Sequence, residues 1–363
     1  MISIFILLLL ALAFVYINGF HDTANSIATV VATRALTPRK AIILATVTNL
    51  MGALVGTAIA ATIAFDLVDP QVITVQTIIA ALIGAIAWDL LTWWWGLPTS
   101  SSQALVGGLC GAALAAAHSN WSEIIWATPG AAHWWQGNGV LYKVIIPMFI
   151  SPLLGFVCAF IVSGILYVLL RNWKVDRVDR VFGRLQIFSG GYIGFAHGNN
   201  DAQKTVGVVV LALVAATKAG TFDQLPAWLG FLRMADAGQG EELLAPFWLK
   251  FACAIALAAG TAAGGWRIIQ TMGRRITDLK PINGFAAETT AATVLTGAAL
   301  LGFPVSTTHT ITAAVAGVGA SRRFSAVHLS VIRRIIWAWV FTLPASALAA
   351  YLTVQLFRLF GLK

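Results

Sequence analysis

The sequence predicts an all-α polytopic membrane protein made of two inverted-topology repeats of about five membrane segments each. Its 363 residues are 59% hydrophobic and only 10% charged, and the mean hydropathy is +0.83, which excludes an ordinary soluble domain. The apolar stretches are long enough for helices that cross about 30 Å of hydrocarbon. Two polar motifs interrupt these stretches and return, altered, in the second half, which indicates an internal repeat.

The apolar segments divide into two sets. Those of the first half lie near residues 2–33, 38–64, 72–95, 98–117 and 140–170, and those of the second half lie near 185–217, 247–268, 283–301, 304–320 and 335–360. The first segment of each set is too long for one straight span, so we expect a broken helix there. Residues 171–184 form a short basic connector. It separates an N-terminal transmembrane repeat at 1–170 from a C-terminal one at 185–363.

The positive charges of the chain predict its orientation. The net charge is +9, and basic residues cluster between apolar segments at 34–40, 171–184, 267–280 and 322–334. The positive-inside rule puts these loops in the cytoplasm and the N-terminus outside. An odd number of crossings per repeat then inverts one half relative to the other, a plan that many secondary transporters share, with their site at the midplane. The expected partner is the lipid bilayer, not nucleic acid. Segment 98–117 is open to a second interpretation as a re-entrant hairpin.

The first repeated motif carries buried carboxylates. Residues 19–26 read GFHDTANS, and residues 194–205 read GFAHGNNDAQKT. Asp22 and Asp201 therefore lie inside apolar segments, where a charge costs at least a few kcal/mol and marks a functional site by default. The Gly, Asn, Ser and Thr residues around them predict an unwound backbone whose groups are free to bind a ligand.

The second repeated motif follows one apolar segment and begins the next. Residues 96–103 read GLPTSSSQ, and residues 302–309 read GFPVSTTH. Proline suits the first turn of a helix, and Ser or Thr nearby caps its free N–H groups. Such a helix start also binds anions, and hydroxyl groups add donors. Capping alone would explain either copy, but the recurrence in both halves favours a ligand site.

The two pairs of motifs resemble the signatures of the inorganic phosphate transporter (PiT) family, and within it those of the bacterial low-affinity phosphate permeases. The similarity runs over nearly the whole chain, with the motifs in the same order. It implies a symporter in the bacterial inner membrane that imports inorganic phosphate with a cation, with two Pro-Ser/Thr hairpin turns at the midplane. It implies no enzymatic activity and no cofactor, and arsenate is the expected substrate analogue.

The resemblance also assigns roles to residues of this chain. The residues implied to bind phosphate are Asn200, Lys204, Thr205, Ser100, Ser101, Ser102, Ser306, Thr307 and Thr308. Carboxylates repel phosphate, and hard cations prefer oxygen ligands, so the acidic positions are better suited to a coupling ion or a proton. The residues expected to serve that role are Asp22, Asn25, Ser26, Asp201 and Glu288.

One position departs from the pattern of the sodium-coupled relatives. They keep an Asn three residues after the Asp in both repeats, whereas this chain has Asn25 in the first and Lys204 in the second. An ammonium group suits phosphate and also fills the space of a bound cation. We therefore expect coupling to protons, or transport of a metal–phosphate with protons, rather than coupling to two sodium ions. The alternative is that Lys204 extends to the membrane interface.

Three competing functions are weighed against phosphate transport. A divalent-metal carrier would use ligands such as His21, Asp22, His197 and Asp201, but we identify no pair of ligand residues one helical turn apart, so no dedicated metal site is predicted. An intramembrane hydrolase or a helical scaffold would not need duplicated halves. The sequence leaves open any homo-oligomer and the roles of His21, His197, His309 and Asp89.

Overall fold

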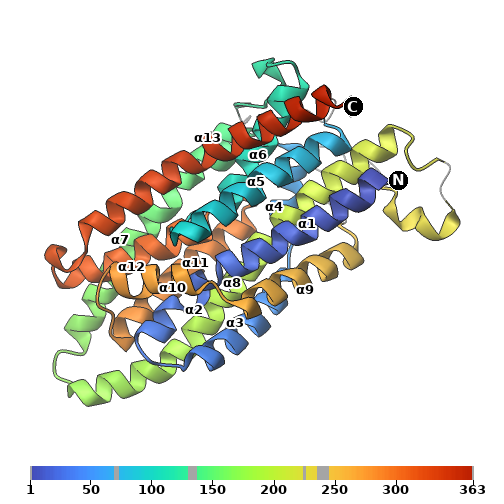
Figure 1. The fold of residues 1–363 in the computed structure, drawn as a ribbon. Helices are drawn as coiled ribbons and strands as arrows, with labels where there is room; N and C mark the ends of the chain where they lie inside the picture. Colours follow the sequence, from blue (N-terminus) through green and yellow to red (C-terminus); the bar gives the residue numbers. More distant parts are fainter. Residues whose placement is uncertain (1, 69–72, 130–136, 224–225, 235–244, 362–363) are drawn as a thin grey trace.

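The computed structural model describes residues 2–68, 73–129, 137–223, 226–234 and 245–361, and its regular elements there are helices (Figure 1). In the first half these are α1 (Ile2–His21), α2 (Thr23–Ala32), α3 (Pro38–Ala53), α4 (Ala58–Phe65), α5 (Val75–Trp95), α6 (Ser101–Ala116), a π-helical turn (Leu141–Ile145) and α7 (Ile146–Leu169). In the second half they are α8 (Val175–Lys218), α9 (Phe247–Ala263), α10 (Trp266–Gln270), a π-helical turn (Thr271–Arg275), α11 (Pro281–Leu300), α12 (Thr307–Arg322) and α13 (Leu329–Leu359). The start of the predicted segment 72–95, residue 72, lies outside the described residues.

The first repeated motif breaks its helix in only one of its two copies. Asp22 separates α1 from α2, as predicted, and has the non-helical angles φ −95° and ψ 4°. Helix α8, in contrast, runs without interruption for 44 residues through the second copy, so the expectation of an unwound backbone there is wrong. The glycines of this copy serve close packing instead. A Cβ at Gly198 would lie 2.2 Å from the backbone oxygen of Asn49 in α3.

Two other breaks occur where the sequence did not predict them. Helices α3 and α4 are bent relative to each other by 66°, and α9 is bent by 61° relative to the helical segment Trp266–Arg275. Both bends occupy the second predicted segment of a half, so the two halves share this feature as well.

Four helical segments of the described residues are long and apolar enough to cross a membrane, or six if each bent pair counts as one span. The four are Ile2–Ala32, Val75–Trp95, Leu141–Leu169 and Leu329–Leu359. Helices α6 and α12 have only 16 residues each, which gives about 24 Å of length, less than the roughly 30 Å of hydrocarbon. The predicted segments 98–117 and 304–320 are therefore too short to cross alone.

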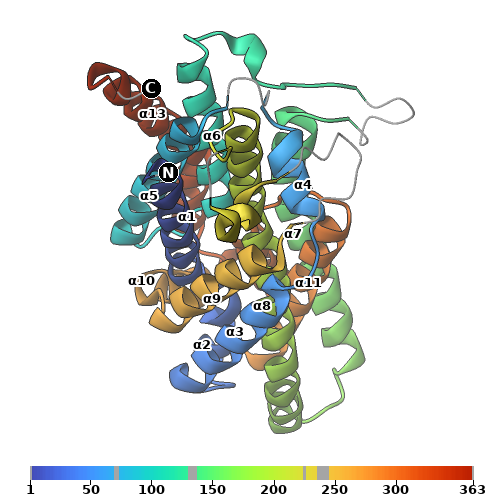
Figure 2. The ribbon, with the colours of Figure 1, turned by 90° about the vertical axis from the view of Figure 1, so that its right-hand side faces the viewer.

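These short helices are the returning arms of two helical hairpins, α5–α6 and α11–α12. The ends of α6 and α13 lie side by side, as a hydrogen bond from Arg358 Nη2 to the backbone oxygen of Ala116 (2.9 Å) shows. Both chain termini lie at this end, as Figures 1 and 2 show. Helix α12 ends beside the end of α7, where Ser321 Oγ donates to Ser163 Oγ (2.9 Å). The hairpins thus enter from opposite ends of the molecule and turn inside it, which supports the re-entrant interpretation of segment 98–117.

Several helices of each half pack on helices of the other half. Helix α6 packs on α13, and its counterpart α12 packs on α7; likewise α1 packs on α9 and α3 on α8. Equivalent glycines make these contacts close: a Cβ at Gly111 would lie 2.1 Å from the Ala347 backbone oxygen, and one at Gly317 would lie 2.3 Å from that of Phe156. This reciprocity is what inverted repeats would produce, although the inversion itself stays a prediction.

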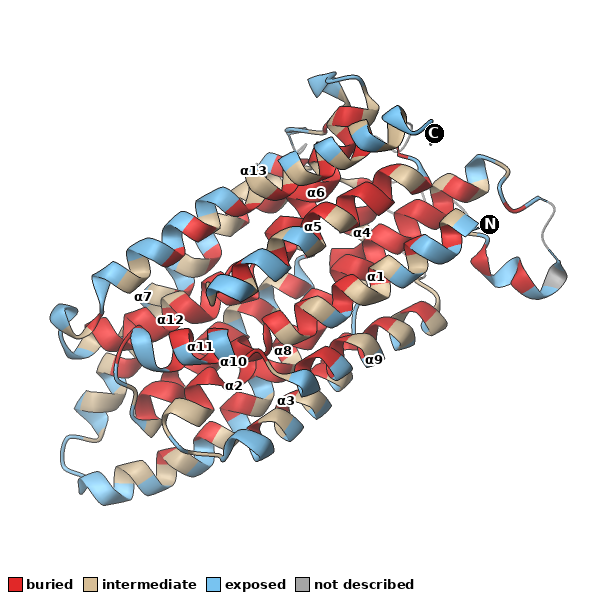
Figure 3. Cartoon of the chain, in the orientation of Figure 1, coloured by how far each residue is buried: buried red, intermediate tan, exposed pale blue. Residues whose placement is uncertain are grey.

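The distribution of buried and exposed residues agrees with this arrangement of the helices. The inner helices are buried through the middle of the molecule, while the outer faces of α7 and α13 are exposed (Figure 3). Large apolar side chains occupy those outer faces, among them Phe149, Leu153, Phe341 and Leu352. Exposed apolar surface of this extent fits a helix bundle whose solvent is lipid.

Candidate functional site

The turns of the two hairpins meet near the middle of the bundle, and each begins a capped helix. Ser100 Oγ accepts a hydrogen bond from the backbone N–H of Gln103 (3.2 Å), and Ser306 Oγ accepts one from that of His309 (3.1 Å). These two hydroxyls are therefore N-caps, as the alternative interpretation of the motif expected. The other hydroxyls of the turns are left to make contacts elsewhere.

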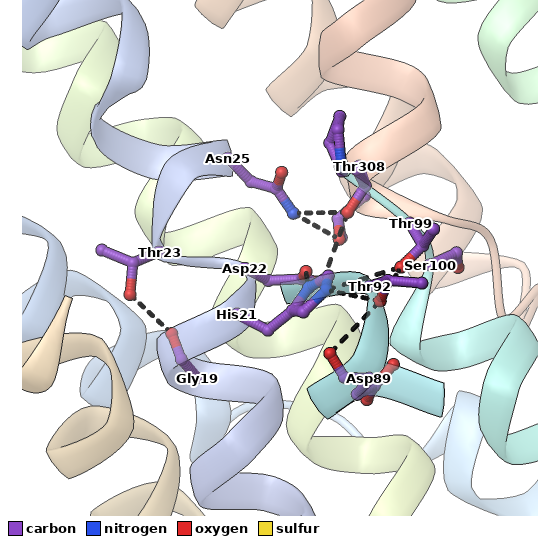
Figure 4. A network of polar contacts seen from close by, with 12 residues as sticks. Gly19, His21, Asp22, Thr23, Asn25, Asp89, Thr92, Thr99, Ser100 and Thr308 are labelled. Carbon is purple, nitrogen blue, oxygen red and sulfur yellow. Dashed lines mark hydrogen bonds and ion pairs between the residues drawn. The ribbon is translucent and has the colours of Figure 1, made fainter. Parts of the chain in front are cut away.

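The α1–α2 break brings Asp22 to the second hairpin (Figure 4). Asp22 Oδ1 lies 2.7 Å from His21 Nδ1, and Asp22 Oδ2 accepts a hydrogen bond from Thr308 Oγ1 (3.3 Å). Asn25 Nδ2 donates to both Thr307 Oγ1 (3.2 Å) and Thr308 Oγ1 (2.9 Å). A motif of the first half thus holds the turn of the second, and all these side chains are buried.

Helix α8 supplies the matching group from the second half. Asp201 Oδ1 lies 2.7 Å from Lys204 Nζ, and Asp201 Oδ2 accepts a hydrogen bond from Thr307 Oγ1 (3.3 Å). Lys204 Nζ also donates to Ser102 Oγ in the first hairpin and to the Val305 backbone oxygen in the second (2.9 Å). Lys204 is 1% exposed, so the alternative that it extends to the interface is wrong. One ammonium group joins both turns to a carboxylate.

His197 and Asp201 lie one turn apart on α8, with Nε2 and Oδ2 separated by 3.1 Å. They form a pair of ligand residues one helical turn apart. The expectation that the sequence contains no such pair is therefore wrong. His197 Nδ1 lies 2.8 Å from Asn49 Oδ1 and donates to it, while His197 Nε2 has no hydrogen-bond partner among the described residues. Ligand atoms of Asp22, His197 and Asp201 lie within 4.8 Å of one another, close enough to share one cation.

Several buried polar atoms at the motifs have no hydrogen-bond partner among the described residues. The atoms are Asn25 Oδ1, Ser26 Oγ, Ser101 Oγ, Thr205 Oγ1 and both side-chain polar atoms of Asn200. Leaving such an atom unpaired costs about 1–3 kcal/mol, and natural structures contain few of them. Their concentration in the two motifs indicates a site that a polar ligand completes.

Glu288 forms a separate cluster between α2, α8 and α11. Its carboxylate accepts hydrogen bonds from Gln186 Nε2 (2.8 Å) and from the hydroxyls of Thr29 and Ser189. No bond joins it to Asp22 or Asp201 in the part of the chain that the structure describes. Among those residues it has no ion-pair partner either, and it is fully buried. Glu288 was expected from the sequence, but its three donors, which are polar residues inside predicted spans, were not.

Asp89, whose role could not be predicted from the sequence, lies in α5 near the first hairpin (Figure 4). It is buried, and its carboxylate oxygens have no hydrogen-bond partner among the described residues. Two threonines that the sequence analysis did not name connect this region to the site. Thr99 Oγ1 donates to Thr92 Oγ1 (2.8 Å), which lies 3.2 Å from His21 Nε2. His309 instead stacks on Trp339, with ring centroids 3.9 Å apart.

Comparisons with known proteins agree with this architecture. The model of the phosphate transporter family matches residues 18–350. A probable low-affinity inorganic phosphate transporter of Rhizobium meliloti is 44% identical over 95% of this chain and 94% of its own. One of Bacillus subtilis with the same description is 40% identical over 94% and 93%. A solved structure described as the sodium-dependent phosphate transporter is 24% identical, has a TM-score of 0.80 and is matched over 99% of this chain and 100% of its own, which shows a shared fold.

Proposed function

This chain belongs to the phosphate transporter family, whose members are transporters and not enzymes, and on that premise we propose that it imports inorganic phosphate by cation symport with alternating access. One observation carries the proposal. Lys204 Nζ joins Asp201, Ser102 and the Val305 backbone oxygen, so a cationic group stands where two hairpin turns from opposite ends of the molecule meet.

The substrate site that we propose lies around this ammonium group. Its direct donors to phosphate are Lys204, the hydroxyls of Ser101 and Ser102, and Asn200 and Thr205. The unpartnered hydroxyls of Ser101 and Thr205 and the unpartnered Nδ2 of Asn200 support this assignment, because donating hydrogen bonds to a charged oxygen would satisfy them. Thr307 and Thr308 bind the two carboxylates in this conformation and turn to phosphate when those carboxylates take up cations. Ser100 and Ser306 contribute through the helix starts that they cap.

The charges at this site explain why a cation must accompany phosphate. Asp22 and Asp201 provide two negative groups and Lys204 one positive group, all buried. Adding an anion leaves an excess of buried negative charge, which costs several kcal/mol unless it is compensated. We propose a proton as the compensating cation, held between His197 and Asp201, whose Nε2 and Oδ2 atoms lie 3.1 Å apart.

A cation bound by Asp22, His197 and Asp201 is the second candidate, because their ligand atoms lie within 4.8 Å of one another. His and carboxylate ligands suit a divalent transition metal, which would enter as substrate, alone or as a metal–phosphate. Sodium fits carboxylates and the amide of Asn25 as well, and the solved protein of similar fold is described as sodium-dependent. Lys204 next to Asp201 argues against a second sodium ion at that position.

We assign a further step of proton or cation transfer to Glu288. It is a buried carboxylate with three neutral donors and, within the described ranges, no cationic partner. A group in such a setting is stable when it shares its charge with a proton or a cation.

The hairpins are the proposed gates of alternating access. Since α5–α6 and α11–α12 enter from opposite ends and their turns share Lys204, movement of one hairpin would open the site to one side only. The basic residues indicate which side is which. The loops at the end opposite the termini are those between α2 and α3, between α7 and α8, and between α12 and α13 (Figure 1). Basic residues cluster in and beside these loops, at 34–40, 171–184 and 322–334. We propose that this end faces the cytoplasm of a bacterial inner membrane.

Radiolabelled phosphate uptake into proteoliposomes, with sodium and proton gradients imposed separately, tests the function. We expect uptake driven by the proton gradient without sodium, inhibited by arsenate. The variant Lys204→Asn should shift the dependence towards sodium. Uptake that strictly requires sodium in the unmodified protein would refute proton coupling, and metal uptake without phosphate under both gradients would favour the metal carrier. The test uses the full-length chain and does not depend on whether the protein is a monomer or a homo-oligomer.

A further inference from the structure

A second polar cavity lies far from the transport site, at the basic end of the molecule. It has a volume of about 350 Å³ and is formed by two segments, Thr277–Lys280 before α11 and Arg322–His328, which begins at the last residue of α12. Its volume is in the range of small-molecule binding pockets. The cavity sits at the base of the α11–α12 hairpin, opposite the turn that holds the transport site.

The groups that line this cavity favour an anion. Lys280, Arg322 and Arg323 are positively charged, and Asp278 is the one carboxylate among the lining residues. Arg322 Nη1 donates weakly to the backbone oxygen of Asp278, at 3.4 Å, so most of its donors remain free for a ligand. Arginine forks match the oxygens of a phosphate group, and lysine adds a point charge.

Two further features indicate that the cavity is a built site. Thr277 lies in its wall, is 1% exposed, and its Oγ1 has no hydrogen-bond partner among the described residues. The two loops are also fixed to each other. The His328 backbone N–H donates to the Ile276 backbone oxygen (2.9 Å), and His328 Nδ1 donates to that of Arg275 (3.1 Å). His328 also lines the cavity.

We propose that this cavity binds a phosphate-bearing ligand from the basic face, either a soluble anion with more than one phosphoryl group or the headgroup of an anionic phospholipid. Lys280 precedes the first residue of α11, and Arg322 is the last residue of α12. A ligand between them clamps the two arms of the hairpin together. The site goes beyond the transport function and gives the cell a way to restrain this gate.

The test uses the full chain in nanodiscs and two probes. Isothermal titration calorimetry with pyrophosphate, in neutral phosphatidylcholine, measures the soluble ligand. Mass spectrometry of phosphatidylglycerol retained after purification measures the lipid. The test variant is Arg322→Gln/Arg323→Gln, and the matched control is Arg333→Gln/Arg334→Gln, an exposed arginine pair of the same end that does not line the cavity.

We expect the test variant to bind its probe at least about tenfold more weakly, because losing one hydrogen bond to a charged group has about this effect. The control should keep the affinity of the unmodified protein. Weaker pyrophosphate binding identifies a soluble ligand, and loss of retained phosphatidylglycerol alone identifies a lipid. If neither probe distinguishes the two variants, the arginines form only a solvated basic surface and the proposal is overturned. Unchanged phosphate uptake by the test variant in the absence of either probe shows that its transport site is intact.

Discussion

Lys204 and Asp201 form an ion pair one turn apart on α8, with Nζ 2.7 Å from Oδ1, and both side chains are buried. The pair sits between two hairpin turns that come from different halves of the chain, because Lys204 also bonds Ser102 and Val305. A buried pair of this kind contributes little net stability, yet removing one member is costly. Its position suggests that it holds the gates together until substrate and cation rearrange its contacts.

The variant Lys204→Met should be destabilised by about 3–5 kcal/mol, because it leaves the charge of Asp201 buried without its nearest cation. The double variant Lys204→Met/Asp201→Asn should recover most of this loss. Unfolding in a denaturing-detergent titration measures both, and the exposed Lys174→Met should stay within about 0.5 kcal/mol of the unmodified protein. Equal destabilisation of the single and double variants would show that Lys204 matters through packing and not through charge.

Two serines of the hairpin turns should respond differently to replacement by alanine. Ser306→Ala removes a cap and should cost about 1 kcal/mol of stability, measured by thermal unfolding. Ser101→Ala removes an unpartnered hydroxyl and should instead raise the KM for phosphate about tenfold, the value of one hydrogen bond to a charged group. A Ser101→Ala protein with unchanged phosphate uptake would exclude this hydroxyl from the substrate site.

The variant Glu288→Gln should fold but lose at least about tenfold in uptake rate, since an amide keeps the size of the side chain and cannot carry a proton or hold a cation's charge. Its remaining uptake should depend less on external pH than that of the unmodified protein. Glu123→Gln, in the loop after α6, is the control and should transport normally. Normal rate and pH dependence in Glu288→Gln would restrict Glu288 to a structural role.

Two equivalent glycines should tolerate no side chain. An added Cβ would lie 2.1 Å from the Ala347 backbone oxygen in Gly111→Ala and 2.3 Å from that of Phe156 in Gly317→Ala. Each should destabilise the protein by about 1–3 kcal/mol, the usual cost of overpacking. Gly164→Ala in α7 meets no atom within 4 Å and should leave the stability unchanged or raise it by up to about 1 kcal/mol in the same thermal assay, because alanine favours a helix more than glycine does. Equal effects at all three positions would show that the close contacts at Gly111 and Gly317 do not set the cost, since helix propensity by itself favours alanine over glycine.

The sequence by itself determined the membrane class, the boundaries of most helices and the two pairs of motifs. These depend on local properties: the length of an apolar run, a proline and serine at a helix start, and a carboxylate where lipid would surround the helix. Asp22 at a helix break and Ser100 and Ser306 as caps could be predicted for this reason. The family could be inferred from the motifs as well.

Only the tertiary structure decided what the motif residues touch. Glycine and asparagine in residues 194–205 gave the same local signal as the first motif, but α3 packs against them and α8 stays unbroken. A lysine inside a predicted span could equally have extended to the interface, and it is the two turns around Lys204 that bury it. The donors to Glu288 come from α2 and α8, far from it in sequence. Such contacts depend on how distant helices pack, and a single sequence carries no local signal for that.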